Sequence, residues 1–351
     1  MKNILLTGGA GFIGSHTCLI LLERGFNVIV YDSFINSSKD SLENVKKICN
    51  KQNNKNKGNL SIINGDICDL NKLNKVFYQA KETNNFIDGV IHFAGLKSVR
   101  ESVENPIKYW DINVNGTINL LKIMELYDCN SIVFSSSATI YGSCEFGSLS
   151  ENSKINPVNP YGVTKLTIER LLNDVFNSCP NKWRIANLRY FNPIGAHSSG
   201  LIGEDCKGQI NNIFPLILEV ASGRRKELEV FGNDWPTPDG TCLRDYVHVM
   251  DISEGHINTL NYLFQNVPKI INLNLGTGLG TSVLELINTF SETNKVEIPY
   301  KITSRRDGDV PMLVADNSLS KKILNWFPNR SLEIMCKDGW EWKLKYPNGF
   351  K

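Results

Sequence analysis

The sequence has little that would direct it to a membrane, to nucleic acid or to a secretory route. No run of apolar residues approaches the roughly 18 needed to cross a bilayer, and Met1 leads directly into the strand-like segment NILLTG, without a charged and then apolar signal region. The formal net charge of the 351 residues is only +2, too weak a field to attract nucleic acid or an anionic membrane. We therefore expect no nucleic-acid partner, no membrane partner, and a small-molecule ligand.

The sequence also lacks a metal-binding pattern. Its nine cysteines are scattered singly, with no Cys-x-x-Cys pair and no histidine at ligand spacing, and its five histidines are equally dispersed. An odd, unpatterned set of cysteines in a large chain indicates reduced thiols, so we expect a cytoplasmic protein without a bound metal ion. His16 and His92 are interpreted as packing residues with satisfied hydrogen bonds.

Short β-rich runs alternate with helical patterns through the first half of the chain. The strand-like runs are NILLTG, NVIVYD, LSIING, GVIHFAG, NSIVFSSS and WRIANLRYF, and between them lie helical patterns over 12–24, 70–83 and 107–127 and a helix starting at 161. Strict alternation of strand and helix predicts a parallel sheet with helices on both faces, the doubly wound α/β (Rossmann) fold.

Beyond about residue 190 this alternation loosens. Proline and glycine are frequent in GNDWPTPDGTC and RRDGDVP, and helical patterns near 213–222 and 282–292 lie among loops. We expect residues 1–190 to form a nucleotide-binding domain and residues 191–351 a smaller substrate-binding lobe, with a strand near 271–276 that rejoins the sheet. The polar stretch 50–59 predicts a solvated loop.

The N-terminal stretch ILLTGGAGFIGSH has a strand, a glycine turn and a helix start in the order typical of dinucleotide binding. Its glycines satisfy G-x-G-x-x-G as Gly9, Gly11 and Gly14, and G-x-x-G-x-x-G as Gly8, Gly11 and Gly14. Such glycines let the backbone approach a pyrophosphate, and the helix N-terminus supplies amide donors. NVIVYD then ends in Asp32, whose carboxylate can bind ribose hydroxyls, and Ser33 rather than arginine follows, which favours NAD over NADP.

Two later strand ends fit the same cofactor. NGDICD places Asp66 and Ile67 after the third strand, where the carboxylate and the Ile67 backbone could hold an adenine. Asp66 could equally be the N-cap of the following helix. HFAG places Gly95 where small residues could pass beneath the phosphates.

The segments FSSSATIYG (134–142) and NPYGVTK (159–165) carry the candidate chemistry. Ser137 lies at the carboxyl end of the fifth strand, the edge where open α/β sheets bind ligands, and Tyr161 and Lys165 lie one helical turn apart on one face. Lowering the pKa of a tyrosine from about 10 to near 7 needs roughly 4 kcal/mol. A lysine charge about 6 Å away supplies roughly 3 kcal/mol at an effective dielectric constant near 20. We interpret Tyr161 as a general base that Lys165 acidifies, beside the hydroxyl of Ser137.

These segments resemble the extended short-chain dehydrogenase/reductase superfamily and, more closely, UDP-galactose 4-epimerases. TGGAGFIG with Ser137, Tyr161 and Lys165 carries the wider resemblance, and VIHFAGLKSVRESVENP, LRYFNPIGAH, FGNDWPTPDGTCLRDYVHVMDISEGH and RRDGDVP carry the closer one. The resemblance spans residues 4 to about 316. It implies tightly bound NAD, transient oxidation of the sugar at C4, rotation of the 4-keto sugar and return of the hydride to either face, which interconverts UDP-galactose and UDP-glucose.

The resemblance also implies two sets of contact residues. Those for the cofactor are Gly8, Gly11, Phe12, Ile13, Gly14, Asp32, Ser33, Asn36, Asp66, Ile67, Phe93, Ala94, Gly95, Lys97, Tyr161, Lys165 and Tyr190. Those for the UDP-sugar are Lys97, Ser137, Tyr161, Phe191, Asn192, Asn212, Phe231, Arg244, Tyr246, Arg306, Asp309 and Leu313. The planar guanidinium groups of Arg244 and Arg306 suit diphosphate oxygens, and Asp309 suits a ribose hydroxyl. The helices near 107–127 and 161–178 imply a homodimer that pairs through a four-helix bundle.

Several alternatives stay open. A sugar-nucleotide 4,6-dehydratase of the same superfamily would need an Asp-Glu pair beside the serine position, and SSSATIYG offers no carboxylate. An epimerase for uronic acids or pentoses is harder to separate, whereas an NAD-sensing regulator without turnover would tend to lose Tyr161 or Lys165. Leu313 stands where relatives selective for glucose and galactose usually have tyrosine, so activity on N-acetylated UDP-sugars is also open.

Overall fold

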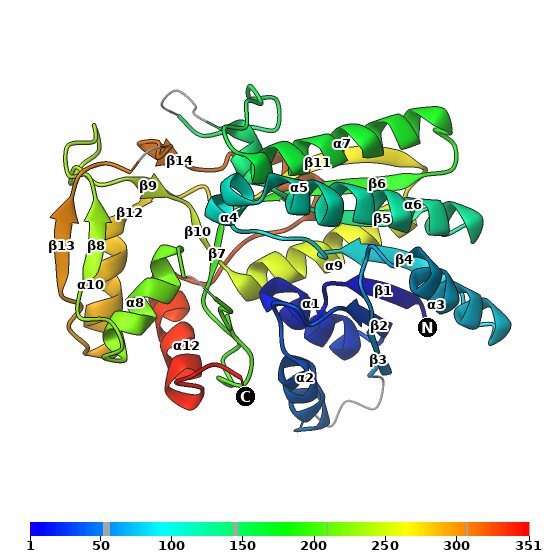
Figure 1. The fold of residues 1–351 in the computed structure, drawn as a ribbon, viewed down its shortest axis with the longest axis horizontal. Coiled ribbons are helices and arrows are strands. Elements are labelled where there is room, and N and C mark those ends of the chain that lie inside the picture. Colours follow the sequence, from blue (N-terminus) through cyan, green and yellow to red (C-terminus); the bar gives the residue numbers. More distant parts are fainter. Residues whose placement is uncertain (52–56, 143–146, 209, 307, 351) are drawn as a thin grey trace.

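Seven parallel strands form the central sheet of the chain (Figure 1). The structure is a computed structural model that describes residues 1–351 except 52–56, 143–146, 209, 307 and 351. The strands are β1 (Asn3–Thr7), β2 (Asn27–Asp32), β3 (Leu60–Asn64), β4 (Ile87–His92), β5 (Ser131–Ser137), β6 (Arg184–Tyr190) and β11 (Lys269–Leu275). Their order is β11-β6-β5-β4-β1-β2-β3, and every neighbouring pair is parallel. The predicted doubly wound α/β fold is confirmed.

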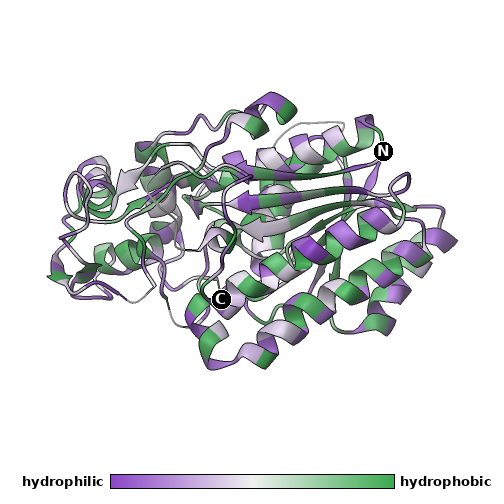
Figure 2. Cartoon of the chain, turned by 90° about the horizontal axis from the view of Figure 1, so that it is seen from above, coloured by the Kyte–Doolittle hydropathy of each residue, from purple (hydrophilic) through white to green (hydrophobic). Residues whose placement is uncertain are grey.

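Helices cover both faces of this sheet (Figure 2). Alternate residues of a strand point to opposite faces. On one face Ile4 and Leu6 pack against α1 (Phe12–Glu23), α2 (Lys39–Lys51) and α9 (Val249–Gln265). On the other face Leu5 packs against α3 (Leu70–Glu82), α6 (Gly116–Leu126) and α7 (Pro160–Ser178). Because both faces are buried, the strands are almost continuously apolar, as in NILLT.

The helix predicted over 107–127 is present as one continuous helical run of α5 (Pro106–Tyr109), the π-helix η1 (Trp110–Asn115) and α6. The short helix α4 (Val99–Glu104) precedes it. The π-helical turn carries Asn113, whose Oδ1 accepts a hydrogen bond from the Leu96 amide at 2.7 Å. The segment therefore fixes the loop that follows β4.

A second set of short strands and helices lies beside the carboxyl edge of the sheet, on the left of Figure 1. The strand groups are β7 (Asn192–Ile194) with β10 (Tyr246–His248), β8 (Leu228–Phe231) with β13 (Tyr300–Thr303), and β9 (Leu243–Arg244) between β12 (Thr281–Ser282) and β14 (Met312–Leu313). The helices are α8 (Ile213–Ala221), α10 (Val283–Asn294), α11 (Ser318–Leu324) and α12 (Leu332–Lys345). Phe214, Leu286, Phe290 and Met335 belong to a separate core of this lobe.

The chain passes between the two sets of elements more than once. After β6 it enters the second set, returns to the sheet for α9 and β11, and leaves again for α10. The boundary at residue 190 stays a prediction. Residues 52–56 of the predicted loop lie outside the described residues. In the described part of the chain, no helix is long and apolar enough to span a bilayer.

Candidate active site

In the glycine turn between β1 and α1, the backbone packs too closely for a Cβ at Gly8 or Gly14. Gly8 has φ +69°, and a Cβ on it would lie 2.6 Å from the Ala94 nitrogen. A Cβ on Gly14 would lie 2.5 Å from the Gly8 carbonyl oxygen. Gly11 is the N-cap of α1 and makes no side-chain cap, so the first amides of α1 are available to a ligand beside the turn.

Asp32 holds its carboxylate against this turn. Its Oδ2 accepts a hydrogen bond from the Ala10 amide at 2.9 Å, and its Oδ1 accepts from the Phe34 amide and the Ser37 hydroxyl, both at 2.9 Å. The carboxylate is buried at the end of β2. Ser33 beside it is half-buried and Asn36 is exposed.

Asp66 follows β3 and is exposed, and the next residue, Ile67, is buried. The Asp66 Oδ1 accepts from the Cys68 amide at 2.9 Å. The N-cap of α3 is Asp69, which accepts from the Lys72 amide, so the alternative that Asp66 caps this helix is wrong.

The loop after β4 contains Phe93, Ala94, Gly95 and Lys97. A Cβ on Gly95 would lie 3.0 Å from Oδ1 of Asn113, and the Asn113 amide group donates to the Leu96 carbonyl at 3.2 Å. Lys97 reaches across to the second lobe, where its Nζ pairs with Oε1 of Glu204 at 2.7 Å. The loop is thus tied to both sides of the site.

The catalytic candidates converge from β5 and α7. Asn159 caps α7 by accepting from the Gly162 amide at 2.8 Å, and Pro160 occupies the first turn, as the Asn-Pro signal predicts. Lys165 is buried, donates from Nζ to the Ser135 carbonyl at 2.7 Å, and lies 5.8 Å from the centre of the Tyr161 ring. Ser137 lies close enough to Tyr161 for its hydroxyl to act on the pKa of the tyrosine.

Burial dominates the electrostatics of this group. Burial raises the pKa of Tyr161, while the hydrogen bond from Ser137 and the charge of Lys97 act in the opposite direction. Burial also lowers the pKa of Lys165 to about 8, against the opposing effect of Glu169. The same burial that brings Tyr161 and Lys165 together disfavours both charged forms, so the expectation that the Lys165 charge lowers the pKa of Tyr161, with the cationic nicotinamide of oxidised NAD supplying the remainder, stays a prediction.

The predicted clamps for the nucleotide lie together in the second lobe. Oδ1 of Asp309 is 2.8 Å from Nη2 of Arg306 and 3.6 Å from Nη2 of Arg244. The Arg306 guanidinium lies 5.3 Å from the centre of the Phe231 ring. Leu313 of β14 stands opposite Arg244 of β9 in a parallel ladder.

Among the described residues of this lobe, several buried polar atoms have no hydrogen-bond partner, including Nε1 of Trp342 in α12. Two of them, Oδ1 of Asn192 and the hydroxyl of Tyr246, lie on the neighbouring strands β7 and β10. An unsatisfied buried polar group costs about 1–3 kcal/mol, so such groups suit a ligand that completes them. Asn212 is exposed and is the N-cap residue of α8, but its side chain makes no capping hydrogen bond. Its side-chain amide is therefore not used to cap the helix.

Tyr190 and Phe191, at the end of β6, are both buried. The Tyr190 hydroxyl is 2.5 Å from Nε2 of His256, so this hydroxyl is already engaged with α9. Phe191 packs with Tyr141, their ring centres 6.5 Å apart.

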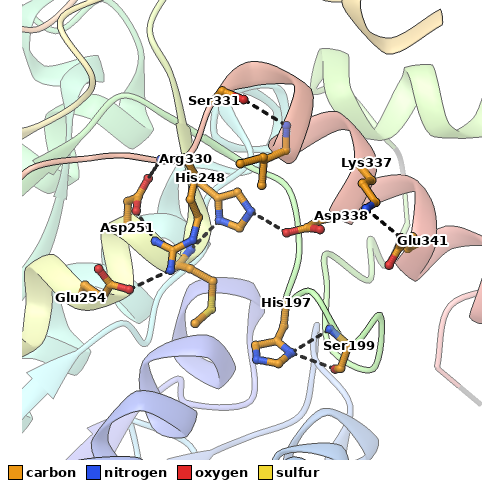
Figure 3. Close-up of polar contacts among 12 residues, drawn as sticks. His197, Ser199, His248, Asp251, Glu254, Arg330, Ser331, Lys337, Asp338 and Glu341 are labelled. Atoms are coloured by element: carbon orange, nitrogen blue, oxygen red, sulfur yellow. Dashed lines mark hydrogen bonds and ion pairs between the residues drawn. The ribbon is translucent and has the colours of Figure 1, made fainter. Parts of the chain in front are cut away.

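The histidines lie away from the reacting groups. Both ring nitrogens of His92 are bonded, to the hydroxyls of Thr7 at 2.7 Å and Thr117 at 2.9 Å, which confirms it as a packing residue. His16 bonds the Phe12 carbonyl through Nδ1 at 2.7 Å, but its buried Nε2 has no partner among the described residues, so the expectation that its hydrogen bonds are satisfied holds for only one of its ring nitrogens. His248 lies between β10 and α12, 3.3 Å from Asp338, in the polar network of Figure 3.

Arg330 adds a second connection in that network. It pairs with Asp251 and, at 2.9 Å, with Glu254, both on α9 (Figure 3). Together with His248 and Asp338, this pairing fastens α12 and the segment before it to the sheet side of the molecule.

Three buried polar residues support the site without being among the predicted site residues. Asn113 holds the loop after β4. Asp245 stands in the sequence between the site residues Arg244 and Tyr246. Its carboxylate accepts hydrogen bonds from the backbone amides of Thr277, Gly278 and Ala315. Glu169 follows Lys165 by one turn and pairs with Arg189 at 2.7 Å. The i, i+4, i+8 spacing of Tyr161, Lys165 and Glu169 is the signal that could have found it.

Comparison with known proteins matches residues 5–339 to the GDP-mannose 4,6 dehydratase family. A UDP-glucose 4-epimerase from Yersinia enterocolitica is 48% identical over 349 residues, which cover 99% of both chains. The crystal structure of UDP-glucose-4-epimerase from Stenotrophomonas maltophila, with bound NAD and formylated UDP-arabinopyranose, has a TM-score of 0.93 and 41% identity over 99% of both chains. That from Bifidobacterium longum, in complex with NAD+ and UDP, has a TM-score of 0.91 and 42% identity over 99% of this chain and all of the other.

The doubly wound sheet, with its glycine turn and with Ser137, Tyr161 and Lys165 at one edge, defines an extended short-chain dehydrogenase/reductase. Within that class, the chain belongs to the UDP-glucose 4-epimerase family. The resemblance seen in the sequence is confirmed. The roles of the individual site residues stay predictions.

Proposed function

We propose that this chain is an NAD-dependent enzyme that interconverts UDP-galactose and UDP-glucose. The observation that carries the proposal is the convergence of Ser137, Tyr161 and Lys165 on the carboxyl edge of the sheet that holds the glycine turn. Full-length similarity to UDP-glucose 4-epimerases supports it.

The residues at the sheet edge fit NAD. Gly8 and Gly14 keep the turn free of side chains, the start of α1 offers amides to phosphate oxygens, and the Asp32 carboxylate lies where ribose hydroxyls would donate to it. Bound NAD supplies the acceptor that takes the C4 hydride and later returns it.

Tyr161 acts as the base that removes the proton of the sugar 4-hydroxyl and as the acid that returns it. Ser137 donates a hydrogen bond within the same group, and the Lys165 charge favours the phenolate. Because burial in this structure opposes ionisation of Tyr161, we expect the phenolate to form only when further positive charge is adjacent.

Epimerisation requires the 4-keto sugar to turn while the nucleotide stays fixed, so most of the binding free energy belongs on the UDP. Arg244 and Arg306 offer planar donors to the diphosphate, and Asp309 between them accepts from a ribose hydroxyl. Asn192 and Tyr246 provide buried polar groups that a ligand can satisfy.

Incubation of the purified protein with UDP-galactose, without added NAD, tests the function. We expect UDP-glucose to form without net NADH. Loss of water from the sugar would indicate a dehydratase, turnover of only UDP-pentoses or UDP-uronic acids would indicate another epimerase, and no turnover of any of these would favour an NAD-sensing role. The absence of a carboxylate in the SSSATIYG segment speaks against the dehydratase.

Leu313 carries a second proposal, on the range of sugars. It is half-buried opposite Arg244 and packs beside a cluster that includes Tyr141 and Phe191. A leucine there is smaller than a tyrosine, so we expect modest activity on UDP-N-acetylglucosamine. If neither the parent protein nor Leu313→Ser has activity on UDP-N-acetylglucosamine, residue 313 does not determine whether N-acetylated sugars are accepted.

We also propose a homodimer that pairs through the helices near 107–127 and 161–178. Ile107 and Trp110, three residues apart in the α5–η1 run, are exposed at 83% and 40%, and Val103 in the preceding α4 is exposed at 62%; exposed apolar side chains of this kind suit a partner surface. Sedimentation should give a dimer that Ile107→Glu dissociates. A monomeric parent protein at micromolar concentration would contradict this. The cytoplasmic location stays a prediction from the scattered cysteines.

A further inference from the structure

The hydroxyl of Ser137 accepts two hydrogen bonds from a single residue. Ser137 is the N-cap of the 3-10 helix η2 (Ala138–Tyr141), and its Oγ accepts from the Thr139 amide at 3.2 Å and from the Thr139 hydroxyl at 2.9 Å. A serine hydroxyl has one proton to donate and two lone pairs that accept. Thr139 therefore occupies both acceptor positions of Ser137.

The only hydrogen-bonding capacity left to Ser137 is donation of its own proton. Tyr161 is the neighbouring side chain that this proton can serve, because the Ser137 hydroxyl lowers the pKa of Tyr161 against the effect of burial. That direction is the one expected when a donor stabilises a phenolate.

An ordinary helix N-cap does not require this arrangement. A capping serine needs only the bond from a backbone amide, which Thr139 supplies through its own N–H. The second bond, from the Thr139 hydroxyl, adds nothing to the cap, but it removes the lone pair that Ser137 would otherwise offer to a substrate hydroxyl.

We propose that Thr139 is a positioning residue that holds Ser137 as a donor only, so that the sugar 4-hydroxyl gives its proton directly to Tyr161 and not through Ser137. The inference rests on the proposed function. In this step the O–H bond at sugar C4 breaks and an O–H bond forms on the Tyr161 phenolate, while Ser137 keeps its proton. A relay through Ser137 would need a free lone pair, which exists only if a bond to Thr139 breaks.

Two variants of Thr139 and one control test the proposal. Thr139→Val removes the hydroxyl and keeps the shape, and Thr139→Ser restores the hydroxyl. The control is Thr259→Val in α9, where the lost hydroxyl bonds only the Gly255 carbonyl. We expect Thr139→Val to move the acidic limb of the kcat/KM profile up by about one pH unit, a tenfold loss below that limb. Thr139→Ser should stay within about twofold of the parent, and Thr259→Val should keep the parent profile.

A proton inventory of the unmodified protein gives a second measurement that does not depend on any variant folding. In single turnovers in mixed light and heavy water, direct transfer moves one proton and gives a linear plot, whereas a relay moves two and gives a curved one. A curved plot, or a Thr139→Val profile identical to the parent, would overturn the proposal.

A spectroscopic titration separates this inference from the proposed function. The phenolate absorbance of Tyr161 is obtained as the difference between each protein and the same protein carrying Tyr161→Phe. We expect the Tyr161 pKa to rise in Thr139→Val, whether or not the protein turns over UDP-galactose. An unchanged Tyr161 pKa would reject the role of Thr139, and absent turnover with a raised pKa would reject only the assigned reaction.

Discussion

The two sides of the candidate site are built differently. On the sheet side, the polar groups of Asp32, Asn113 and Lys165 already have partners in the chain. On the side of the second lobe, Oδ1 of Asn192 and the hydroxyl of Tyr246 are buried without one.

The difference follows from the kind of backbone on each side. Parallel strands that end at one edge present carbonyls and amides at fixed positions, so Lys165 can bond the Ser135 carbonyl and Asp32 the Ala10 amide. The strands of the second lobe are only two to four residues long. Such short strands leave some polar groups without hydrogen-bond partners. We infer that folding alone satisfies Asp32, Asn113 and Lys165, and that the nucleotide satisfies Asn192 and Tyr246.

The largest loss of activity should come from changing Tyr161, the proposed base on the sheet side. Tyr161→Phe keeps the ring and its packing but removes the only proton acceptor at the sugar hydroxyl, so we expect kcat to fall by about three orders of magnitude. Bound NAD, measured after denaturation of the protein, should stay at the parent level. Near-normal turnover would refute the assignment.

Breaking a partnered buried group should cost stability. Glu169→Gln removes the charge that Arg189 pairs with at 2.7 Å and that Ser136 donates to at 2.5 Å. Removing one member of a buried ion pair costs about 3–5 kcal/mol, and urea unfolding should show a loss of that order. A change below about 1 kcal/mol would mean that the sheet side is less tightly built than its contacts indicate.

The charge of Lys165 should set the alkaline side of the activity profile. Burial lowers its pKa to about 8, so the ammonium is lost as the pH rises through that value. We expect kcat/KM to fall about tenfold per pH unit above it. In Lys165→Arg, whose side chain stays charged, any remaining activity should lack this limb. A parent profile that is flat to pH 10 would contradict the expected role.

Removing an unpartnered group should have the opposite effect on stability. Tyr246→Phe deletes a buried hydroxyl without a partner, so the free energy of unfolding of the protein without nucleotide should rise by about 1 kcal/mol, while KM for UDP-galactose rises. Tyr141→Phe is the matched control, since its hydroxyl bonds Asn274 and Arg189, and it should lower stability. Destabilisation by Tyr246→Phe would remove the contrast between the two sides.

The smallest change in stability is expected for the ion pair that joins the sheet side to the second lobe. Lys97 pairs with Glu204 across the site, but 61% of the lysine side chain is exposed, so Glu204→Gln should change the free energy of unfolding by less than about 1 kcal/mol. Urea unfolding at low and high salt checks this. A loss above 2 kcal/mol would show that the pair holds the lobes together.

Local patterns in the sequence predicted much of the sheet side. The alternation of strands and helices gave the parallel sheet, and the i, i+4 spacing of Tyr161 and Lys165 behind Asn159 gave their common face. The helix α9 was missed, partly because its N-cap is His248, a residue type outside the usual capping set.

Properties that depend on burial and on distant partners could not be predicted in this way. The direction of the Tyr161 pKa shift is set by burial, which no local pattern reports. The Glu169–Arg189 pair joins residues of α7 and β6, and the unsatisfied hydroxyl of Tyr246 is known only once its surroundings are. Family resemblance, rather than spacing, pointed to Arg244, Arg306 and Asp309.

The late return of the chain to its sheet has a consequence for biosynthesis. A ribosome finishes residues 1–190 well before it makes α9 and β11, and until then β6 has no neighbour on its outer side and α1 lacks its cover. An unpaired strand edge is a template for aggregation. The sheet of the nascent chain therefore stays incomplete until about residue 275 has left the exit tunnel. A fragment that stops at residue 190 should aggregate.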